Sequence, residues 1–365
     1  MTFGVLRSTA SVLEAAGAQP AACGACTWSR RSVLAGAIGL ALANGQAGAQ
    51  PSRAAPVIDF HTHMCDRQLL QQKGGPPGPA KPDVAARLFD PAAQISDMDR
   101  YGVDINVITM SNALQGISWG NAQQDLQIHR RINDEIATKW VGRYPQRFVG
   151  ACTLPMQDLS LAIPEMERCV RQLGCKVVEI SSATPDGIYY GDRRLRPFWE
   201  AVHALNITAF IHPHLNASAP PLDDFALANS VGQGIEEAKV MSSMIYQGLF
   251  DHLPNLKVVV AHGGGFLPHY YGRMDRNVDN MPASARLISR KPSEYLRSFY
   301  YDSCLYSPDI LAALIKIVGI ERIVLGGDYP VGGVDSVGEL RQLKTLSNTD
   351  IALITRQTPA GLLGI

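Results

Sequence analysis

Short runs of β-branched and other apolar residues recur along the chain between residues 57 and 330, with more polar segments between them. Most runs lack strict alternation of apolar and polar positions, which is typical of parallel strands buried on both faces. The pattern predicts strands over Val57–His63, Ile105–Met110, Phe148–Leu154, Cys175–Ile180, Thr208–Pro213, Leu256–Gly263, Phe299–Leu305 and Ile323–Pro330.

Longer segments between these runs repeat apolar residues at the spacing of an amphipathic helix. Ser307 is a suitable N-cap for one of them, with Pro308 at the first helical position. The clearest predicted helices cover Ala122–Tyr144, Leu159–Leu173, Arg196–Leu205, Ile235–Leu253 and Pro308–Val318. Strand–helix repeats over about 300 residues predict a (β/α)8 TIM barrel. A doubly wound open sheet is the alternative, weakened because no Gly-x-Gly-x-x-Gly motif follows the first strand.

Residues 71–82 read QQKGGPPGPAKP, and this Gly and Pro content excludes a regular element. The segment follows the first strand, at the end of the barrel where active sites lie. Two interpretations stay open, a mobile lid over a site and a plain surface loop.

Two histidines lie near the end of the first predicted strand, in IDFHTHM (residues 58–64). Successive side chains of a strand point to opposite faces, so His61 and His63 share one face while Thr62 takes the other. Two imidazoles about 6–7 Å apart along a strand can converge on one metal ion. A pair of structural histidines is the alternative, and residues at the ends of the other strands distinguish between the two interpretations.

Further predicted strands also end on residues that bind metals. His212 follows the apolar run of the fifth strand, His262 that of the sixth, and Asp328 that of the eighth. The carboxyl ends of barrel strands gather around one mouth, so these residues should meet His61 and His63. Imidazole nitrogens with one carboxylate suit a divalent ion such as Zn²⁺, and Mn²⁺ or Fe²⁺ are alternatives because ligand type does not settle identity.

The N-terminal segment has a different character from the rest. SRRSVL (residues 29–34) places two arginines before a short apolar stretch that ends at Ala43, and Ala47-Gly48-Ala49 resembles a cleavage site. The stretch is far shorter than the ~20 residues of a membrane span. We interpret residues 1–49 as a twin-arginine export signal and residues 50–365 as one barrel domain in the periplasm or outside the cell. A disordered extension is the alternative.

Composition and charge mainly argue against certain classes of partner and site. The 33 basic and 33 acidic residues balance, and without a basic stripe nothing favours nucleic acid as a partner. A hydrophobic content of 46% suits a soluble protein with a sizeable core. The cysteines after residue 49 are odd in number and match neither a zinc ribbon nor a disulfide framework, so we expect most to be buried apolar residues.

The motifs at the strand ends resemble those of the amidohydrolase superfamily. They are the His-x-His pair, IHP (residues 211–213), HGGG (262–265) followed by GR (272–273), and GGDYP (326–330). The chain more narrowly resembles the branch named for 2-amino-3-carboxymuconate 6-semialdehyde decarboxylase, through RRINDEIA, RPFWEAV and SPDILAALIKIVGIERIVLGGDYP. The likeness covers nearly everything after residue 56, and its branch holds decarboxylases, hydratases and related lyases and hydrolases.

The resemblance implies roles for individual residues. His61, His63, His212 and Asp328 match the family's metal ligands. His262 matches a histidine that activates metal-bound water or touches the substrate. His262 and Asp328 are therefore the residues that we expect to carry protons.

Two further residues have a role only by this resemblance. Arg273 matches an arginine that reaches the pocket of a neighbouring subunit, which implies a homodimer; a surface salt bridge is the alternative. Trp119 falls in a loop that lines the pocket in relatives, and a core or rim aromatic is its alternative. Two-metal relatives commonly carry a lysine at the end of the fourth strand. Here Lys176 begins that strand and Glu179 lies near its end, so we expect one metal ion.

Several positions depart from the branch pattern. Pro82 replaces a substrate-binding arginine of the namesake, His214 replaces a tryptophan, and Val331 replaces an aromatic residue. The pocket has therefore changed, and we do not expect the namesake's own substrate.

The leading hypothesis is a metal-dependent decarboxylase of a small aromatic or muconate-type carboxylic acid. A hydrolase or lactonase could use the same residues, because both reactions need the same metal ligands. A periplasmic metal- or ligand-binding protein without turnover is the third hypothesis, and His262 argues against it because binding alone needs no fifth residue.

Overall fold

A computed structural model describes residues 55–72, 82–111, 120–214, 222 and 224–365. Within them, eight parallel strands pair in sequence order in one sheet. The strands are β1 (Ile58–Met64), β2 (Ile105–Met110), β3 (Phe148–Cys152), β4 (Val177–Ile180), β5 (Thr208–Ile211), β6 (Val258–Val260), β7 (Tyr300–Asp302) and β8 (Ile323–Val324).

Backbone hydrogen bonds between β1 and the segment after β8 close the sheet almost completely. Phe60 N donates to Leu325 O at 2.8 Å, His63 N donates to Tyr329 O at 2.8 Å, and Tyr329 N donates to His61 O at 3.1 Å. The fold is therefore a nearly closed (β/α)8 barrel, and the open-sheet alternative is wrong.

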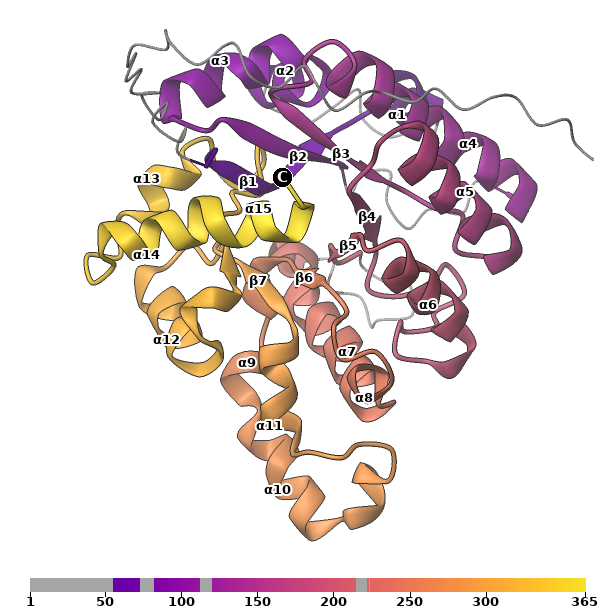
Figure 1. Ribbon diagram of the computed structural model, residues 1–365, viewed down its shortest axis with the longest axis vertical. Helices are drawn as coiled ribbons and strands as arrows, with labels where there is room; N and C mark the ends of the chain where they lie inside the picture. The colour runs from indigo at the N-terminus through magenta and orange to yellow at the C-terminus, as the bar shows by residue number, and fades with distance from the viewer. Residues whose placement is uncertain (1–54, 73–81, 112–119, 215–221, 223) are drawn as a thin grey trace, which may run out of the picture. The chain divides into compact units, whose positions relative to one another are not determined.

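Apolar side chains fill the interior of the barrel below its mouth. Alternate residues of the strands point inward, as expected of a pleated strand. They form one buried cluster with the last helix, α15 (Thr358–Leu363), drawn in yellow in Figure 1. Its members are Ile58, Phe60, Val107, Ala151, Val177, Phe210, Val259, Ala261, Val324, Ala360, Leu362 and Leu363.

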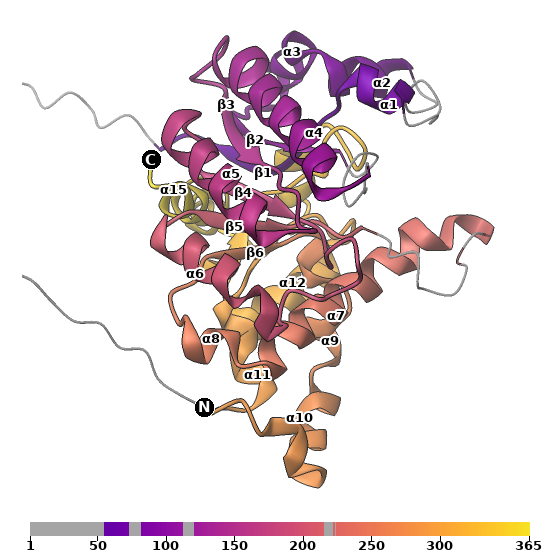
Figure 2. The same cartoon turned by 90° about the vertical axis from the view of Figure 1, so that its right-hand side faces the viewer.

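Helices surround the strands, as Figures 1 and 2 show, and a second apolar cluster lies between the two layers. The helices are α1 (Arg67–Gln72), α2 (Pro82–Phe89), α3 (Pro91–Tyr101), α4 (Ala122–Glu135), α5 (Leu159–Gln172), α6 (Arg196–Ala204), α7 (Gln233–Tyr246), α8 (Leu249–His252), α9 (Leu267–Tyr270), α10 (Gly272–Asn280), α11 (Pro292–Tyr295), α12 (Pro308–Val318), α13 (Ser336–Leu340) and α14 (Asn348–Ala352).

Several strands are shorter than predicted because their last residues leave the sheet at the mouth. β5 ends at Ile211, so His212 follows the strand instead of lying within it. β8 ends at Val324, well before the predicted end at Pro330. Asp328 has a φ of 49°, and this left-handed conformation is incompatible with a strand.

Two predicted helices are also interrupted. The helix predicted from Ala122 is α-helical to Glu135 and continues as a π-helix over Ile136–Val141. The helix predicted over 235–253 breaks at Gly248, where φ is 68°, and gives α7 and α8. The helix after Ser307 has the predicted bounds, and the Ser307 hydroxyl accepts the Ile310 N–H.

Some predictions concern residues outside the described part of the chain. These are the export signal over residues 1–49, Trp119, and most of the 71–82 segment, of which only residues 71, 72 and 82 are described. No helix in the described ranges is both long and apolar enough for a membrane crossing. The five described cysteines are all buried and free.

Candidate metal centre

A layer of polar side chains lies directly above the apolar interior of the barrel. Val107, Ala151, Val177 and Phe210 point inward, and the residue two positions after each is Thr109, Thr153, Glu179 or His212. Because side chains two apart share a face of a strand, these polar residues also face the barrel axis. Histidines and carboxylates from β1 and from the ends of β6, β7 and β8 complete the layer.

His61 is held by a carboxylate that the sequence analysis did not identify. Its Nδ1 lies 2.6 Å from Asp302 Oδ2, and neither side chain is exposed to solvent. The other Asp302 oxygen accepts the N–H groups of Gly263 and Cys304. A carboxylate that accepts Nδ1–H fixes the ring and leaves His61 Nε2 free to bind a metal.

His63 is oriented by a hydroxyl group. Thr109 Oγ1 donates to Thr62 O at 2.8 Å and lies 2.8 Å from His63 Nδ1. Because the hydroxyl proton is already used, we assign the Thr109 oxygen as the acceptor of Nδ1–H. His63 Nε2 then faces His61 Nε2 across 3.1 Å, about the separation of two nitrogens bound to one ion at ~2.1 Å.

His212 and His262 complete a cluster of imidazole rings. The His212 ring centroid lies 5.0 Å from that of His61, 4.8 Å from that of His63 and 5.4 Å from that of His262. His262 Nδ1 lies 2.6 Å from Glu237 Oε1, on α7. The contact requires Gly265, because a Cβ there would lie 2.6 Å from Glu237 Oε2.

Asp328 brings its carboxylate to the same point from the segment after β8, which lies beside β1. Its Oδ1 lies 3.1 Å from His63 Nε2 and 3.4 Å from His61 Nε2. Its Oδ2 lies 3.8 Å from His262 Nε2 and accepts the Tyr306 hydroxyl at 3.1 Å. The five residues predicted to meet at the mouth therefore do meet there.

Burial and charge set the ionisation of these groups. Burial raises the pKa of Asp328, but hydrogen bonds from His262, His61 and His63 hold it well below its ordinary value. Burial lowers the pKa values of His63 and His212. Burial also lowers the pKa of His61, but hydrogen bonds to Asp302 and Asp328 raise it to about 9, so this ring must release a proton when a cation binds. An ionised carboxylate and neutral imidazoles are the forms that bind a metal ion, and residues of these types fit a divalent cation.

The backbone at two of these residues is strained. His262 and Asp328 have φ values of 48° and 49°, in the left-handed region that non-glycine residues rarely adopt. Such strain costs on the order of 1–3 kcal/mol and persists at functional sites, where surrounding contacts hold the residue in place. At both positions it aims the side chain into the mouth.

The geometry is compatible with two different sets of metal ligands. Ligand atoms of His61, His212, His262 and Asp328 all lie within 4.8 Å of one another, so His262 is also placed to bind a metal. His63 is close to two of these residues by the distances given above. The ligand set predicted from the motifs, with His262 left for proton transfer, is thus one of two assignments.

Arg273 is not part of the cluster. It is exposed on α10, which Figure 1 shows with α9 and α11 in a lobe beyond the strands. None of the described contacts brings Arg273 to the histidine cluster of its own chain.

Three residues that orient the histidines, Asp302, Thr109 and Glu237, were not predicted from the sequence. Asp302 ends the apolar run of β7, so the same strand-end rule could have identified it. Glu237 lies within α7, where an acidic residue carries no signal of its own, and only the fold shows its contact with His262.

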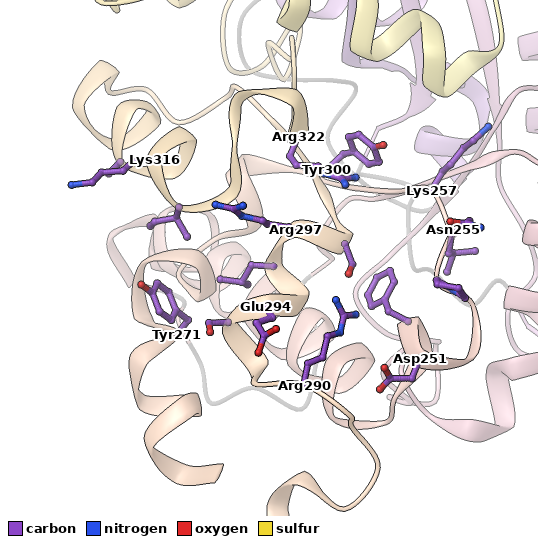
Figure 3. A pocket seen from close by; sticks show the side chains of 18 residues that line it. Asp251, Asn255, Lys257, Tyr271, Arg290, Glu294, Arg297, Tyr300, Lys316 and Arg322 are labelled. Carbon is purple, nitrogen blue, oxygen red and sulfur yellow. The ribbon is translucent and has the colours of Figure 1, made fainter. Parts of the chain in front are cut away.

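A groove of about 1330 Å³ lies at the opposite end of the barrel. Figure 3 shows Lys257, Tyr300 and Arg322 among its lining residues. These residues lie at the amino ends of β6, β7 and β8, and no residue of the metal cluster lines the groove. Because barrel active sites lie at the carboxyl ends of the strands, the groove is separate from the candidate site.

Comparison with known proteins assigns the chain to a family. The family model described as amidohydrolase matches residues 58–365, which include every strand of the barrel and all five clustered residues. The chain belongs to the amidohydrolase family. The membership predicted from the strand-end motifs is thus confirmed.

Several of the relatives that the chain matches are decarboxylases. The chain is 32% identical over 294 residues to 2-amino-3-carboxymuconate-6-semialdehyde decarboxylase of Dictyostelium discoideum, covering 75% of this chain and 81% of the relative. It is 29% identical over 308 residues to gamma-resorcylate decarboxylase of a Polaromonas species, covering 80% and 94%. A crystal structure of dihydroxybenzoic acid decarboxylase from Polaromonas, with bound manganese and 2-nitroresorcinol, matches with a TM-score of 0.74 and 26% identity, covering 85% and 97%.

Proposed function

We propose that this amidohydrolase is a metal-dependent decarboxylase of a small aromatic carboxylic acid. The convergence of His61, His63, His212, His262 and Asp328 at the barrel mouth carries the proposal. The relatives support the reaction class, because those named above are decarboxylases of aromatic or muconate-type acids.

In this proposal His61, His63, His212 and Asp328 hold one divalent ion. The ion, when bound, draws electron density from the substrate oxygens that it contacts. Asp302 and Thr109 fix the rings of His61 and His63. We propose Zn²⁺ from the donor set, while the manganese of the Polaromonas enzyme makes Mn²⁺ the main competitor.

His262 is the proposed proton donor. Loss of CO₂ breaks a carbon–carbon bond and leaves the electron pair on the ring carbon, which must take up one proton. His262 Nε2 faces the cluster, and the Glu237 carboxylate raises the His262 pKa well above its ordinary value, against the lowering effect of burial. A protonated His262 can therefore deliver the proton that replaces CO₂.

The test is a screen for CO₂ release by enzyme whose metal content has been measured by elemental analysis. The panel contains hydroxylated and aminated benzoic acids and muconate-type acids, with metal-free enzyme as the control. We expect metal-dependent CO₂ release from at least one acid. Complete inactivity of zinc- and manganese-loaded enzyme on the panel would reject the decarboxylase.

A hydratase is the second candidate, because 2-keto-4-carboxy-3-hexenedioate hydratase of a Sphingobium species is 25% identical over 306 residues. Water addition to a substrate of the panel without CO₂ release would select it. Ester or lactone hydrolysis would select the hydrolase, and tight metal binding with no turnover would select a binding protein.

We also propose that the enzyme is a homodimer in which Arg273 serves the site of the partner subunit. The exposed position of Arg273 on α10 is compatible with such a contact.

Export by the twin-arginine route is a further proposal, which rests on residues 29–49 of the sequence. Cell fractionation of the Arg30→Lys, Arg31→Lys variant tests it, and an exported variant would reject that route.

A further inference from the structure

We propose that a small cavity beside β2, β3 and β4 receives a hydroxyl or amino substituent of the substrate, and that Glu179 is the group that recognises it. The inference rests on the proposed function, because it concerns the substrate of the same site. It narrows that substrate to an aromatic acid with an additional uncharged polar substituent, in preference to a dicarboxylic acid.

The cavity lies within the polar layer at the barrel mouth. It is lined by residues at the carboxyl ends of three neighbouring strands and by side chains of α4. Glu179 points into the barrel above Val177 and is 3% exposed. Its carboxyl group therefore lies at the level of the metal cluster, on the wall that contributes no metal-binding residue.

One oxygen of the Glu179 carboxyl group has no hydrogen-bond partner among the described residues. Oε2 accepts the Met110 N–H at 2.7 Å, whereas Oε1 is buried and makes no hydrogen bond within the described residues. Leaving a buried polar atom unpaired is unfavourable, because the atom loses its hydrogen bonds to water without a replacement. A ligand that supplies the missing hydrogen bond recovers this free energy.

Several other polar groups around the cavity already have hydrogen-bond partners. His129 Nδ1 contacts the Thr153 hydroxyl, and the Ser181 hydroxyl donates to Ala183 O. Asp125 accepts from the Gln157 amide. Among the described residues that line the cavity, only Glu179 has a buried side-chain atom without a hydrogen-bond partner, and we infer that this Oε1 recognises the substituent.

The polar layer connects this cavity with the metal cluster. Thr109 contacts His63 Nδ1 at 2.8 Å on one side. On the other side its hydroxyl lowers the pKa of the Glu179 carboxyl, which burial raises to about 8. A planar substrate bound at the metal cluster would thus direct a second substituent toward Glu179, which is protonated near neutral pH and can donate a hydrogen bond.

The size and charge of the cavity select the kind of substituent. Its volume is about 30 Å³, enough for a hydroxyl or amino group or for one water. The described residues of its lining include Asp125 and Glu179 but no lysine or arginine. A second carboxylate would meet acidic groups without a compensating cation, and burying such a charge is strongly unfavourable.

The experiment compares two probes that differ by one hydroxyl group. Metal-loaded enzyme is titrated with 2-nitroresorcinol and with 2-nitrophenol, and the ratio of their dissociation constants is measured by calorimetry. We expect the wild type to prefer 2-nitroresorcinol about tenfold, the value of one buried hydrogen bond. Glu179→Met should bring the ratio close to one while the affinity for 2-nitrophenol changes less than about threefold.

Glu179→Gln is the matched variant, because its amide can still donate to a hydroxyl while its oxygen accepts the Met110 N–H. It should keep most of the preference. A merely structural Glu179 would weaken both probes equally in the methionine variant, and that result would overturn the proposal. Equal wild-type affinities, or tighter binding of 3-hydroxy-2-nitrobenzoate than of 2-nitroresorcinol, would also overturn it.

The binding ratio and the CO₂ assay test different statements. A Glu179-dependent preference in an enzyme that releases no CO₂ supports the subsite and removes the decarboxylase. CO₂ release by an enzyme whose preference does not depend on Glu179 supports the decarboxylase and removes the subsite.

Discussion

At the scale of single residues, the candidate centre is defined as much by the partners of its histidines as by the histidines themselves. Asp302, Thr109 and Glu237 each hold a ring nitrogen that faces away from the cluster. A histidine held in this way presents its other nitrogen in a fixed direction and tautomer, which is how metal-binding histidines are usually supported.

The two possible ligand assignments differ in what they predict for variants. With His262 outside the ligand set, His61→Ala and Asp328→Ala should each lose most of the bound metal, because a ligand is removed from the ion. His262→Ala should keep its metal and lose activity about 100-fold or more, because the proton donor is gone. Elemental analysis and rate measurements on the three variants check this. Loss of metal from His262→Ala would place His262 among the ligands.

Variants of Glu237 test whether the orientation of the His262 ring and the negative charge beside it contribute separately to kcat. Glu237→Leu removes both, and we expect kcat to fall about 10- to 100-fold with KM within about threefold and with full metal content. Glu237→Gln keeps an acceptor for the His262 Nδ1–H but removes the negative charge, so its kcat should fall less than that of Glu237→Leu. Steady-state kinetics with metal analysis make the comparison. If both variants have the wild-type kcat, Glu237 has no part in positioning His262.

At the scale of elements, hydrophobic runs predicted where the strands lie, because every strand except β7 contributes a buried inward residue to a single core and Tyr300 of β7 packs against that core. The same rule placed His212 and Asp328 at the mouth. The ends of elements were predicted less well, since they depend on local conformation, as at Asp328, or on tertiary contacts. Glu237 illustrates the limit: its partner is 25 residues away, and no local pattern marks the pair.

Gly248 shows how one residue divides an apparently continuous helix. Its φ is 68°, and a Cβ there would lie 2.3 Å from Leu287 O. Gly248→Ala should lower the free energy of unfolding by at least about 1–2 kcal/mol, because alanine is disfavoured in this conformation. Gly272→Ala is the control, since a Cβ on this α10 residue meets nothing within 4 Å. It should be neutral or stabilise the protein by up to about 1 kcal/mol. Urea unfolding of both variants tests the opposite signs, and equal effects would refute this account.

At the scale of the whole molecule, one buried histidine links stability to pH. Burial lowers the pKa of His129 to about 4 from 6.5. Below pH 6.5 His129 is protonated in the unfolded chain, whereas in the folded protein it stays neutral down to about pH 4. Stability therefore falls as the pH falls through this range. The contribution is about 3 kcal/mol. His129→Gln should therefore lose less stability than the wild type between pH 7 and pH 4 in urea unfolding, and parallel curves would contradict this.

The proposed dimer makes a prediction that concerns two subunits at once. If Arg273 acts in the site of the partner subunit, Arg273→Ala and His262→Ala homodimers should both be inactive, because every site in each lacks one essential group. A mixed dimer contains one site with the His262 of one chain and the Arg273 of the other. Refolding or co-expressing the two variants in equal amounts should therefore restore about a quarter of wild-type activity, since half of the dimers are mixed and each has one complete site. The measurement is specific activity against mixing ratio, with a maximum at equal amounts. If Arg273 acted within its own subunit, the mixture would be as inactive as its components, because no chain would then carry both residues.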